Sequence, residues 1–224
     1  MKKTWLLFAL LTLVISMLAA CNSKDESTSK DEPNTQVETE ETKDVKVIPE
    51  EDENEQEQQV TEERGTDKIL TYLVNGEVKE DTAKLTESDE QNYSIYKVDG
   101  FSLTGEEPNK DSLFLEENSA VFMRIETISK DEASYEIIAN NMKETMAAVT
   151  FGKEPLQIGD KEKLPQGEGI SNQIGYEMTA EIGTVTGIVF EKENLIVRLT
   201  IFDRNAYNLT DAFLKMGETI AEKQ

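Results

Sequence analysis

The chain has 224 residues, of which 46 are acidic and 23 basic, and it carries no histidine and a formal charge of −23 at pH 7. This acidity argues against nucleic-acid binding, which needs a basic surface, and against charge-driven docking on anionic lipid. Without histidine, Ser-His-Asp catalysis and histidine-containing zinc sites are excluded, and we expect no metal and no other cofactor.

The N-terminus carries Lys2 and Lys3, followed by an uncharged run from Trp5 to Leu18. Its fourteen residues are too few to cross a bilayer, which takes about 20, but they suit the hydrophobic part of a secretory signal peptide. The run ends in Leu18-Ala19-Ala20-Cys21. Cys21 is the only cysteine in the chain, so no intramolecular disulfide can form.

The four residues Leu18 to Cys21 resemble the lipobox of bacterial lipoproteins, [LVI]-[AST]-[GA]-C. The resemblance implies a signal peptide over residues 1–20, a diacylglyceryl group on the Cys21 sulfur, and a cell-membrane location on the extracytoplasmic face. Two acyl chains anchor a protein stably, whereas one chain binds weakly and reversibly. The alternative is an ordinary signal peptide with a cysteine placed there by chance.

Residues 21–68 are predicted to be a lipid-anchored, acidic, disordered linker. The 47 residues after Cys21 contain 17 acidic and 6 basic side chains, few apolar residues and no hydrophobic periodicity. Such a segment cannot bury enough apolar surface to offset the entropy lost on ordering. The run Glu50–Gln59 could also collect Ca²⁺ weakly, but it lacks the glycine and ligand spacing of an EF-hand loop.

A single folded domain is predicted over residues 69–224. Asn75-Gly76 is a strong hairpin signal, because both residue types tolerate positive φ. Further short strands are expected at Tyr93–Val98, Phe101–Thr104, Ser112–Glu117 and Ala120–Ile128. Within the last of these, Arg124 interrupts the apolar pattern.

A helix is expected next, because Ser129-Lys130-Asp131-Glu132 has the pattern of a capping box. The apolar residues that follow recur at three- and four-residue steps, namely Tyr135, Ile138, Met142, Met146 and Val149. Three closely spaced strands then predict a meander, with turns at Gly183 and at Glu193-Asn194. They are Ile174–Ile182, Thr184–Lys192 and Leu195–Phe202.

A last helix is expected at Leu209–Glu222, with Asn208 as its cap and Phe213, Met216 and Ile220 on its buried face. This order of strands and helices predicts an α+β fold. In it, two helices cover one face of one antiparallel sheet made of hairpins and a meander.

The stretch from Tyr93 to Ile128, followed by a helix, resembles the opening half of the PsbP-like fold, and the order of elements agrees through Glu222. That fold is shared by an extrinsic subunit of photosystem II, a small nuclear-import factor and some bacterial envelope lipoproteins. The resemblance implies a binding or assembly protein and transfers no functional residue.

Arg124 and Arg198 are the candidate ligand-binding residues, because each interrupts an apolar strand. Two guanidinium groups on one sheet face could recognise a carboxylate or phosphate. The alternative is that each arginine pairs with a nearby acid such as Glu126. Paired carboxylates could support catalysis, but with many acids in the domain no pair stands out.

The leading hypothesis is a non-enzymatic binding or assembly module of the bacterial envelope, attached to the membrane through Cys21. Its partner would be an envelope protein or a small envelope ligand. The alternatives are a carboxylate-dependent cell-wall hydrolase and a lipid- or peptide-binding carrier. Two facing carboxylates in a deep cleft would favour the hydrolase, and a large apolar cavity would favour the carrier.

Overall fold

The computed structural model describes residues 64–149 and 154–224. The predicted signal peptide, Cys21 and the linker up to residue 63 lie outside the described residues. In the two described ranges the chain is mostly antiparallel β-sheet with two α-helices, in agreement with the predicted α+β class. The first strand begins at Asp67, two residues before the predicted start of the domain.

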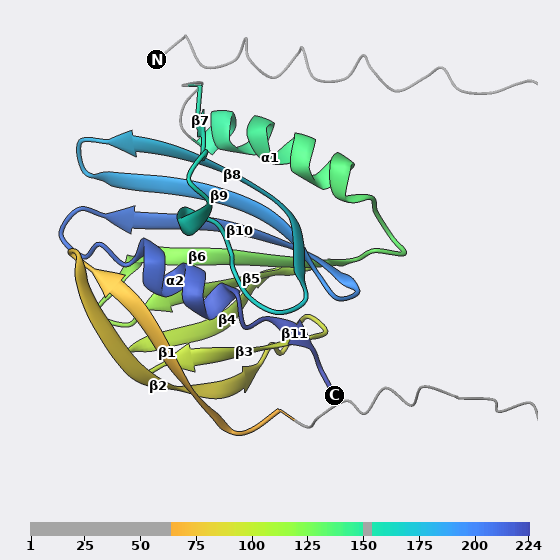
Figure 1. The fold of residues 1–224 in the computed structure, drawn as a ribbon, viewed down its shortest axis with the longest axis horizontal. Helices are drawn as coiled ribbons and strands as arrows, with labels where there is room; N and C mark the ends of the chain where they lie inside the picture. Colours follow the sequence, from red (N-terminus) through yellow and green to blue (C-terminus); the bar gives the residue numbers. More distant parts are fainter. Residues whose placement is uncertain (1–63, 150–153) are drawn as a thin grey trace, which may run out of the picture. The chain divides into compact units, whose positions relative to one another are not determined.

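The strands form two sheets in the described ranges, where the sequence predicted one (Figure 1). The first has the order β1-β2-β3-β11, and its strands are β1 Asp67–Val74, β2 Glu77–Glu87, β3 Tyr93–Val98 and β11 Ala221–Glu222. The second has the order β4-β5-β6-β10-β9-β8-β7. Its strands are β4 Phe101–Glu107, β5 Lys110–Leu115, β6 Asn118–Ser129, β10 Leu195–Arg204, β9 Gly183–Lys192, β8 Ile170–Ala180 and β7 Leu156–Gln157.

The division into two sheets arises at the edge of β3. Ala221 of β11 pairs with Ser94, and the Thr219 hydroxyl accepts a hydrogen bond from the Tyr96 N–H at 2.9 Å. Because residues 219–222 fill this edge, the chain turns at Gly100, where φ is 86°, and β4 pairs with β5 instead. One predicted sheet is therefore divided by a segment that is distant in sequence.

Two tight turns set the register of the longest hairpins. Asn75 and Gly76, both with positive φ, join Val74 to Glu77 in β1 and β2. Glu193 and Asn194 join β9 to β10, whereas the predicted turn at Gly183 is wrong, because Gly183 is the first residue of β9. Any other residue at position 183 would place its Cβ 2.0 Å from the Asp203 carbonyl oxygen. This close approach of two backbones, rather than a turn, explains why position 183 is a glycine.

The two helices, α1 Tyr135–Val149 and α2 Thr210–Gly217, lie on opposite faces of the seven-stranded sheet (Figure 1). The expectation that both cover one face is wrong. In β10, Leu199 packs in the core that surrounds α2, whereas Ile196 packs with Met142 and Met146 of α1. Successive residues of a strand face opposite sides, so the nearly continuous apolar run of β10 is buried on both sides.

The predicted capping box does not start α1. Ser129 is the last residue of β6, and its Oγ accepts a hydrogen bond from the Asp131 N–H at 3.2 Å in a turn. The Lys130 N–H bonds the Asn194 carbonyl, which extends the ladder between the strands past Ser129 and delays the helix to Tyr135. The apolar stripe of α1 is confirmed at Met142 and Met146, which are fully buried.

Helix α2 is shorter than predicted and is capped by a different residue. The Asp203 carboxylate accepts hydrogen bonds from the Thr210 N–H and hydroxyl, both at 2.8 Å, so β10 supplies the cap that the sequence assigned to Asn208. Phe213 and Met216 are fully buried in the core, and the Phe213 ring meets Phe101 edge-on, with 5.2 Å between the ring centroids. The chain leaves the helix at Gly217 and enters β11, where Glu222 lies.

Candidate functional site

Arg124 and Arg198, the arginines that the sequence singled out, lie on neighbouring strands, on the face of the seven-stranded sheet that carries α1. In the register of β6 and β10, Arg198 is opposite Glu126 and Arg124 is opposite Thr200, so the two arginines are diagonal neighbours. This placement is what an anion-recognising pair on one sheet face would require. What each guanidinium group contacts decides what the pair can do.

Arg198 is held between the sheet and α1. Its Nη1 donates to Glu126 at 3.3 Å, and its Nη2 donates to the Thr145 hydroxyl of α1 at 2.5 Å. The side chains of Arg198 and Glu126 are only 14% and 16% exposed. Arg198 therefore fastens α1 to the sheet, which is the predicted alternative of pairing with Glu126.

Arg124 forms a two-point contact with Glu106, at 2.8 Å through Nε and 2.6 Å through Nη2. The hydrogen bonds from Arg124 lower the pKa of Glu106, and those to Glu106 raise the pKa of Arg124. An anion could bind this pair of arginines only by displacing a carboxylate from each. Anion recognition by Arg124 and Arg198 remains a prediction, and the cleft described below is better placed for it.

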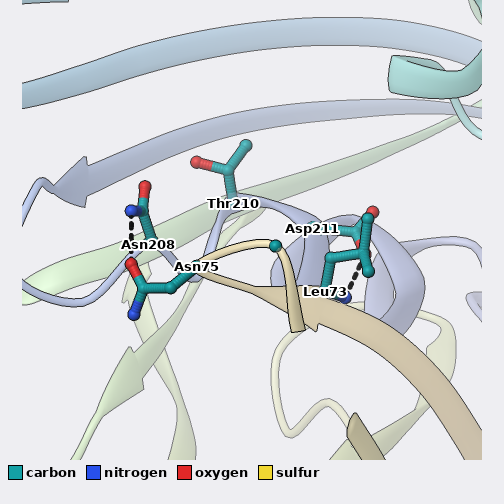
Figure 2. Close-up of a pocket in the computed structure, with 6 residues that line it drawn as sticks. Leu73, Asn75, Asn208, Thr210 and Asp211 are labelled. Carbon is teal, nitrogen blue, oxygen red and sulfur yellow. Dashed lines mark hydrogen bonds between the residues drawn. The ribbon is translucent and has the colours of Figure 1, made fainter. Parts of the chain in front are cut away.

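A depression of about 440 Å³ lies where the β1–β2 turn meets the start of α2 (Figure 2). Its polar groups bind one another: the Asn208 Nδ2 donates to the Asn75 Oδ1 at 2.7 Å, and the Leu73 N–H donates to Asp211 at 2.6 Å. These contacts attach the hairpin to the helix. We therefore interpret this depression as structural.

An adjoining depression of about 420 Å³ gathers several acids, so it is the place to look for a hydrolase. The Asp160 carboxylate accepts a hydrogen bond from the Glu162 N–H at 3.0 Å, and Asp203 caps α2. The Asp211 carboxylate accepts a hydrogen bond from the Leu73 N–H. Glu177 lies 3.7 Å from Lys163. These carboxylates are engaged in holding local structure rather than facing one another as an acid and a base would.

The largest described cleft, about 1170 Å³, lies at the other end of the four-stranded sheet and is named here the Lys192 cleft. Five separate segments form it: the start of β1, the middle of β3, the loop 166–169, the β9–β10 turn, and the residues that follow α2. Three of its cations form what we call the cationic cluster: Arg64, Lys68 and Lys192.

Arg64 forms the fixed part of the cluster. Its Nη1 donates to the Ser94 hydroxyl at 2.6 Å and carbonyl at 3.1 Å, and its Nη2 donates to the Thr219 carbonyl at 2.6 Å. The guanidinium carbon lies 4.7 Å from the centroid of the Tyr96 ring. Burial lowers the pKa of Arg64, against the opposing effect of Tyr96.

Lys192 is the most perturbed lysine among the residues that the structure describes. Burial lowers its pKa to about 8, and repulsion from Arg64 and Lys68 lowers it further, while Glu193 and Glu218 oppose the shift. The Lys192 Nζ donates to the backbone carbonyl of Glu218. This ammonium group is therefore partly desolvated and sits among other positive charges.

The nearby acids Glu193 and Glu218 act on the cluster at a distance but form no ion pair with it. The Glu218 carboxylate accepts hydrogen bonds from the Lys215 Nζ and the Gln166 N–H, both at 2.8 Å. The Lys68 Nζ lies 5.7 Å from the Tyr96 ring centroid. Among the residues that the structure describes, Arg64, Lys68 and Lys192 have no carboxylate within 4.0 Å.

Sequence reasoning missed this cluster. Arg64 and Lys68 fall in the segment assigned to the linker, and Lys192, which ends an ordinary strand, is more than 120 residues from both. Only the tertiary fold brings them together. In the two described ranges there is no group of histidine, cysteine or acidic side chains that could hold a metal ion, and no helix long and apolar enough to span a membrane.

Residues 64–155 match a family described as a domain of unknown function (DUF8580), which covers less than half of the chain. No curated protein matches the sequence. The chain is also similar to a crystal structure of a protein from Bacteroides thetaiotaomicron VPI-5482, with 9% sequence identity and a TM-score of 0.37. That similarity covers 63% of this chain and 49% of the other, so the chain spans about half the length of that protein.

Proposed function

We propose that the protein is a membrane-anchored extracytoplasmic lipoprotein, and that its folded domain is a non-enzymatic binding module of the bacterial envelope. The Lys192 cleft carries the binding part of this proposal, because it is large, open to solvent at Lys68 and lined by the three cations of the cluster, which form no ion pair with any described residue. The Leu18-Ala19-Ala20-Cys21 sequence supports the anchor.

The anchor follows from the chemistry of Cys21. A sulfur-linked diacylglyceryl group would supply two chains, enough for stable attachment. The acidic linker that the sequence predicts over residues 21–68 would then separate the domain from the bilayer by about 40 Å on average, and more through self-repulsion of its charges. This spacing leaves the domain free to reach ligands in the envelope.

The lining of the cleft favours a small charged ligand over the alternatives. A lipid carrier needs a mostly apolar cavity, whereas this cleft presents Arg64, Lys68, Lys192 and several glutamates. A hydrolase needs a free acid and base, whereas Asp160, Asp203 and Asp211 at the acidic depression hold backbone groups.

Site-specific crosslinking in intact cells tests the binding role of the cleft. A photoreactive residue would replace Thr71, which lines the cleft and is exposed, and in a control it would replace the exposed Glu136 on α1. We expect an adduct of defined mass at position 71 and none at position 136. Equal labelling at both positions, or labelling at neither, would contradict a ligand site in the cleft.

Replacing Cys21 with Ala tests the anchor separately. We expect Cys21→Ala to abolish incorporation of labelled fatty acid and to release the protein from the lipid-linked fraction, because the acylated sulfur is lost. Unchanged labelling of the variant would refute the lipoprotein assignment without bearing on the cleft.

A further inference from the structure

We infer that the Lys192 cleft binds its ligand through a phosphate or carboxylate group, which the cationic cluster of Arg64, Lys68 and Lys192 holds. This inference rests on the proposed binding function and adds the chemical class of the ligand. It starts from the absence of an acidic partner for three converging cations in a strongly acidic protein.

The convergence of these cations is informative, rather than the lack of ion pairs alone. Eight cations in the described ranges, among them Arg124, Arg198 and Lys130, have a carboxylate within 4.0 Å, and eight others do not. What distinguishes Arg64, Lys68 and Lys192 is that they converge in one cleft, where Lys192 is partly buried and repelled by the other two. Like charges brought together and partly desolvated oppose folding. An anion from outside would relieve that cost, so the arrangement favours a bound anion.

The contacts that the cluster already makes leave room for this anion. Lys192 donates to a backbone carbonyl, and Lys68 lies near the Tyr96 ring. An ammonium group has three donors, so each lysine retains capacity for a charged acceptor. Hydrogen bonds between ionised partners are about twice as strong as those between neutral groups.

Arg64 gives the cluster its geometry. Its guanidinium group is fixed by Ser94, Thr219 and the Tyr96 ring before any ligand arrives. A preorganised donor loses little entropy on binding. Arg64 therefore provides a fixed positive charge against which an anionic group can align, while Lys68 and Lys192 supply the hydrogen bonds.

The rest of the cleft limits the size and charge of the ligand. A volume of about 1170 Å³ exceeds that of a single anionic group, and Glu168, Glu193 and Glu222 line other parts of it. These acids and the net charge of −23 would repel a polyanion. The ligand is thus a small molecule or chain end with one anionic group and a neutral or cationic remainder.

Calorimetric titration of the full chain in neutral detergent tests the inference. Inorganic phosphate and succinate serve as the phosphate and carboxylate probes. At pH 7 we expect saturable binding of at least one probe, weakened about tenfold or more in Lys192→Met, because one charged hydrogen bond is lost. In Lys110→Met we expect no change, since Lys110 pairs with Glu107 on a distant hairpin.

Glu193→Gln provides a variant with the opposite effect. Glu193 is exposed and lines the cleft, so removing its negative charge should reduce the repulsion of an anionic probe and tighten its binding several-fold. Because Glu193 also supports the charged form of Lys192, this comparison is made at pH 6, where Lys192 stays protonated. Succinate keeps its charge as the pH rises, and its affinity should fall above about pH 8 as Lys192 loses its proton. The Lys192→Met variant should lack this fall in affinity. The other titratable groups around Lys192 are Arg64, Lys68, Tyr96, Glu193 and Glu218.

Binding of neither probe, or equal binding by wild type, Lys192→Met and Glu193→Gln, would overturn the inference. The crosslinking result separates it from the proposed function. An adduct at position 71 together with no response to either probe refutes the anionic ligand and leaves a binding module. No adduct together with probe binding refutes the envelope ligand and leaves an anion site.

Discussion

The cations on the two sides of the fold differ in what surrounds them. On the α1 side, Arg124 and Arg198 are each held by a carboxylate. In the Lys192 cleft, Lys68 and Lys192 meet an aromatic ring and a backbone carbonyl instead. The difference separates charges that hold the fold together from charges that are available to a ligand.

Removing the cations should therefore have opposite consequences in the two regions. Loss of Arg198 should destabilise the fold, because Glu126, which is already largely buried, would then have no partner. Loss of Lys192 should instead relieve repulsion within the cationic cluster. A stability measurement tests the first region, and a pH or binding measurement tests the second.

We expect Arg198→Ala to lower the free energy of unfolding by about 2–4 kcal/mol, because a partly buried carboxylate loses its partner. The variant also loses the bond to Thr145 of α1. Urea unfolding followed by circular dichroism measures the effect. The double variant Arg198→Met with Glu126→Leu should cost less than Arg198→Ala, and a larger loss would show that the ion pair itself is not the cause.

Gly187→Ala should lower stability by about 2 kcal/mol through overpacking beneath α1. A Cβ at Gly187 would lie 2.6 Å from the Met142 sulfur and 2.7 Å from the Met146 sulfur. Gly159→Ala is the matched control, because no atom lies within 4 Å of the added methyl group. Equal melting temperatures for the two variants would mean that α1 is not tightly packed on the sheet.

The pKa of Lys192 predicts a dependence of stability on pH. It is lowered to about 8 in the folded protein and is ordinary, near 10.5, after unfolding. Between these values the unfolded chain binds more protons, so stability should rise with pH, by roughly 2 kcal/mol once the shift is discounted for solvent screening of this partly exposed group. Denaturation between pH 7 and about pH 10.5 should show this rise in the wild type relative to Lys192→Met, and parallel curves would contradict the shift.

Arg124→Ala should cost only about 0.5 kcal/mol, because its contact with Glu106 is partly exposed and screened by solvent. The side chains are 27% and 33% exposed, against 14% and 16% for the Arg198 pair. The loss should shrink further in high salt. A loss as large as that of Arg198→Ala would remove the distinction between the two arginines.

The sequence was sufficient for features that depend on local pattern. The Asn75-Gly76 turn and the apolar stripe of α1 follow from residue type and spacing. Sequence-based prediction failed where a segment distant in sequence took the place of a local partner. Asp203 replaced Asn208 as the cap of α2, and residues 219–222 took the edge of β3.

The cationic cluster could not be predicted from the sequence either, because it also depends on contacts between distant segments. Arg64 precedes β1, Lys68 is the second residue of that edge strand, Lys192 ends β9, and no sequence spacing relates Lys192 to the other two. Charge counting also gave no sign of the cluster, since it does not show which bases lack an acidic partner. Eight of the sixteen cations in the described ranges have no carboxylate within 4.0 Å, and only the fold shows that Arg64, Lys68 and Lys192 lie in one cleft.

The state of Lys192 with and without an anion tests the central claim most directly. Lysine side-chain NMR signals of the full chain would be titrated with and without succinate, and the signal lost in Lys192→Met identifies Lys192. We expect a pKa of about 8 in the free protein and a higher value with succinate bound, because an adjacent anion favours the charged form. A pKa that does not respond to succinate would contradict an anion site in the Lys192 cleft.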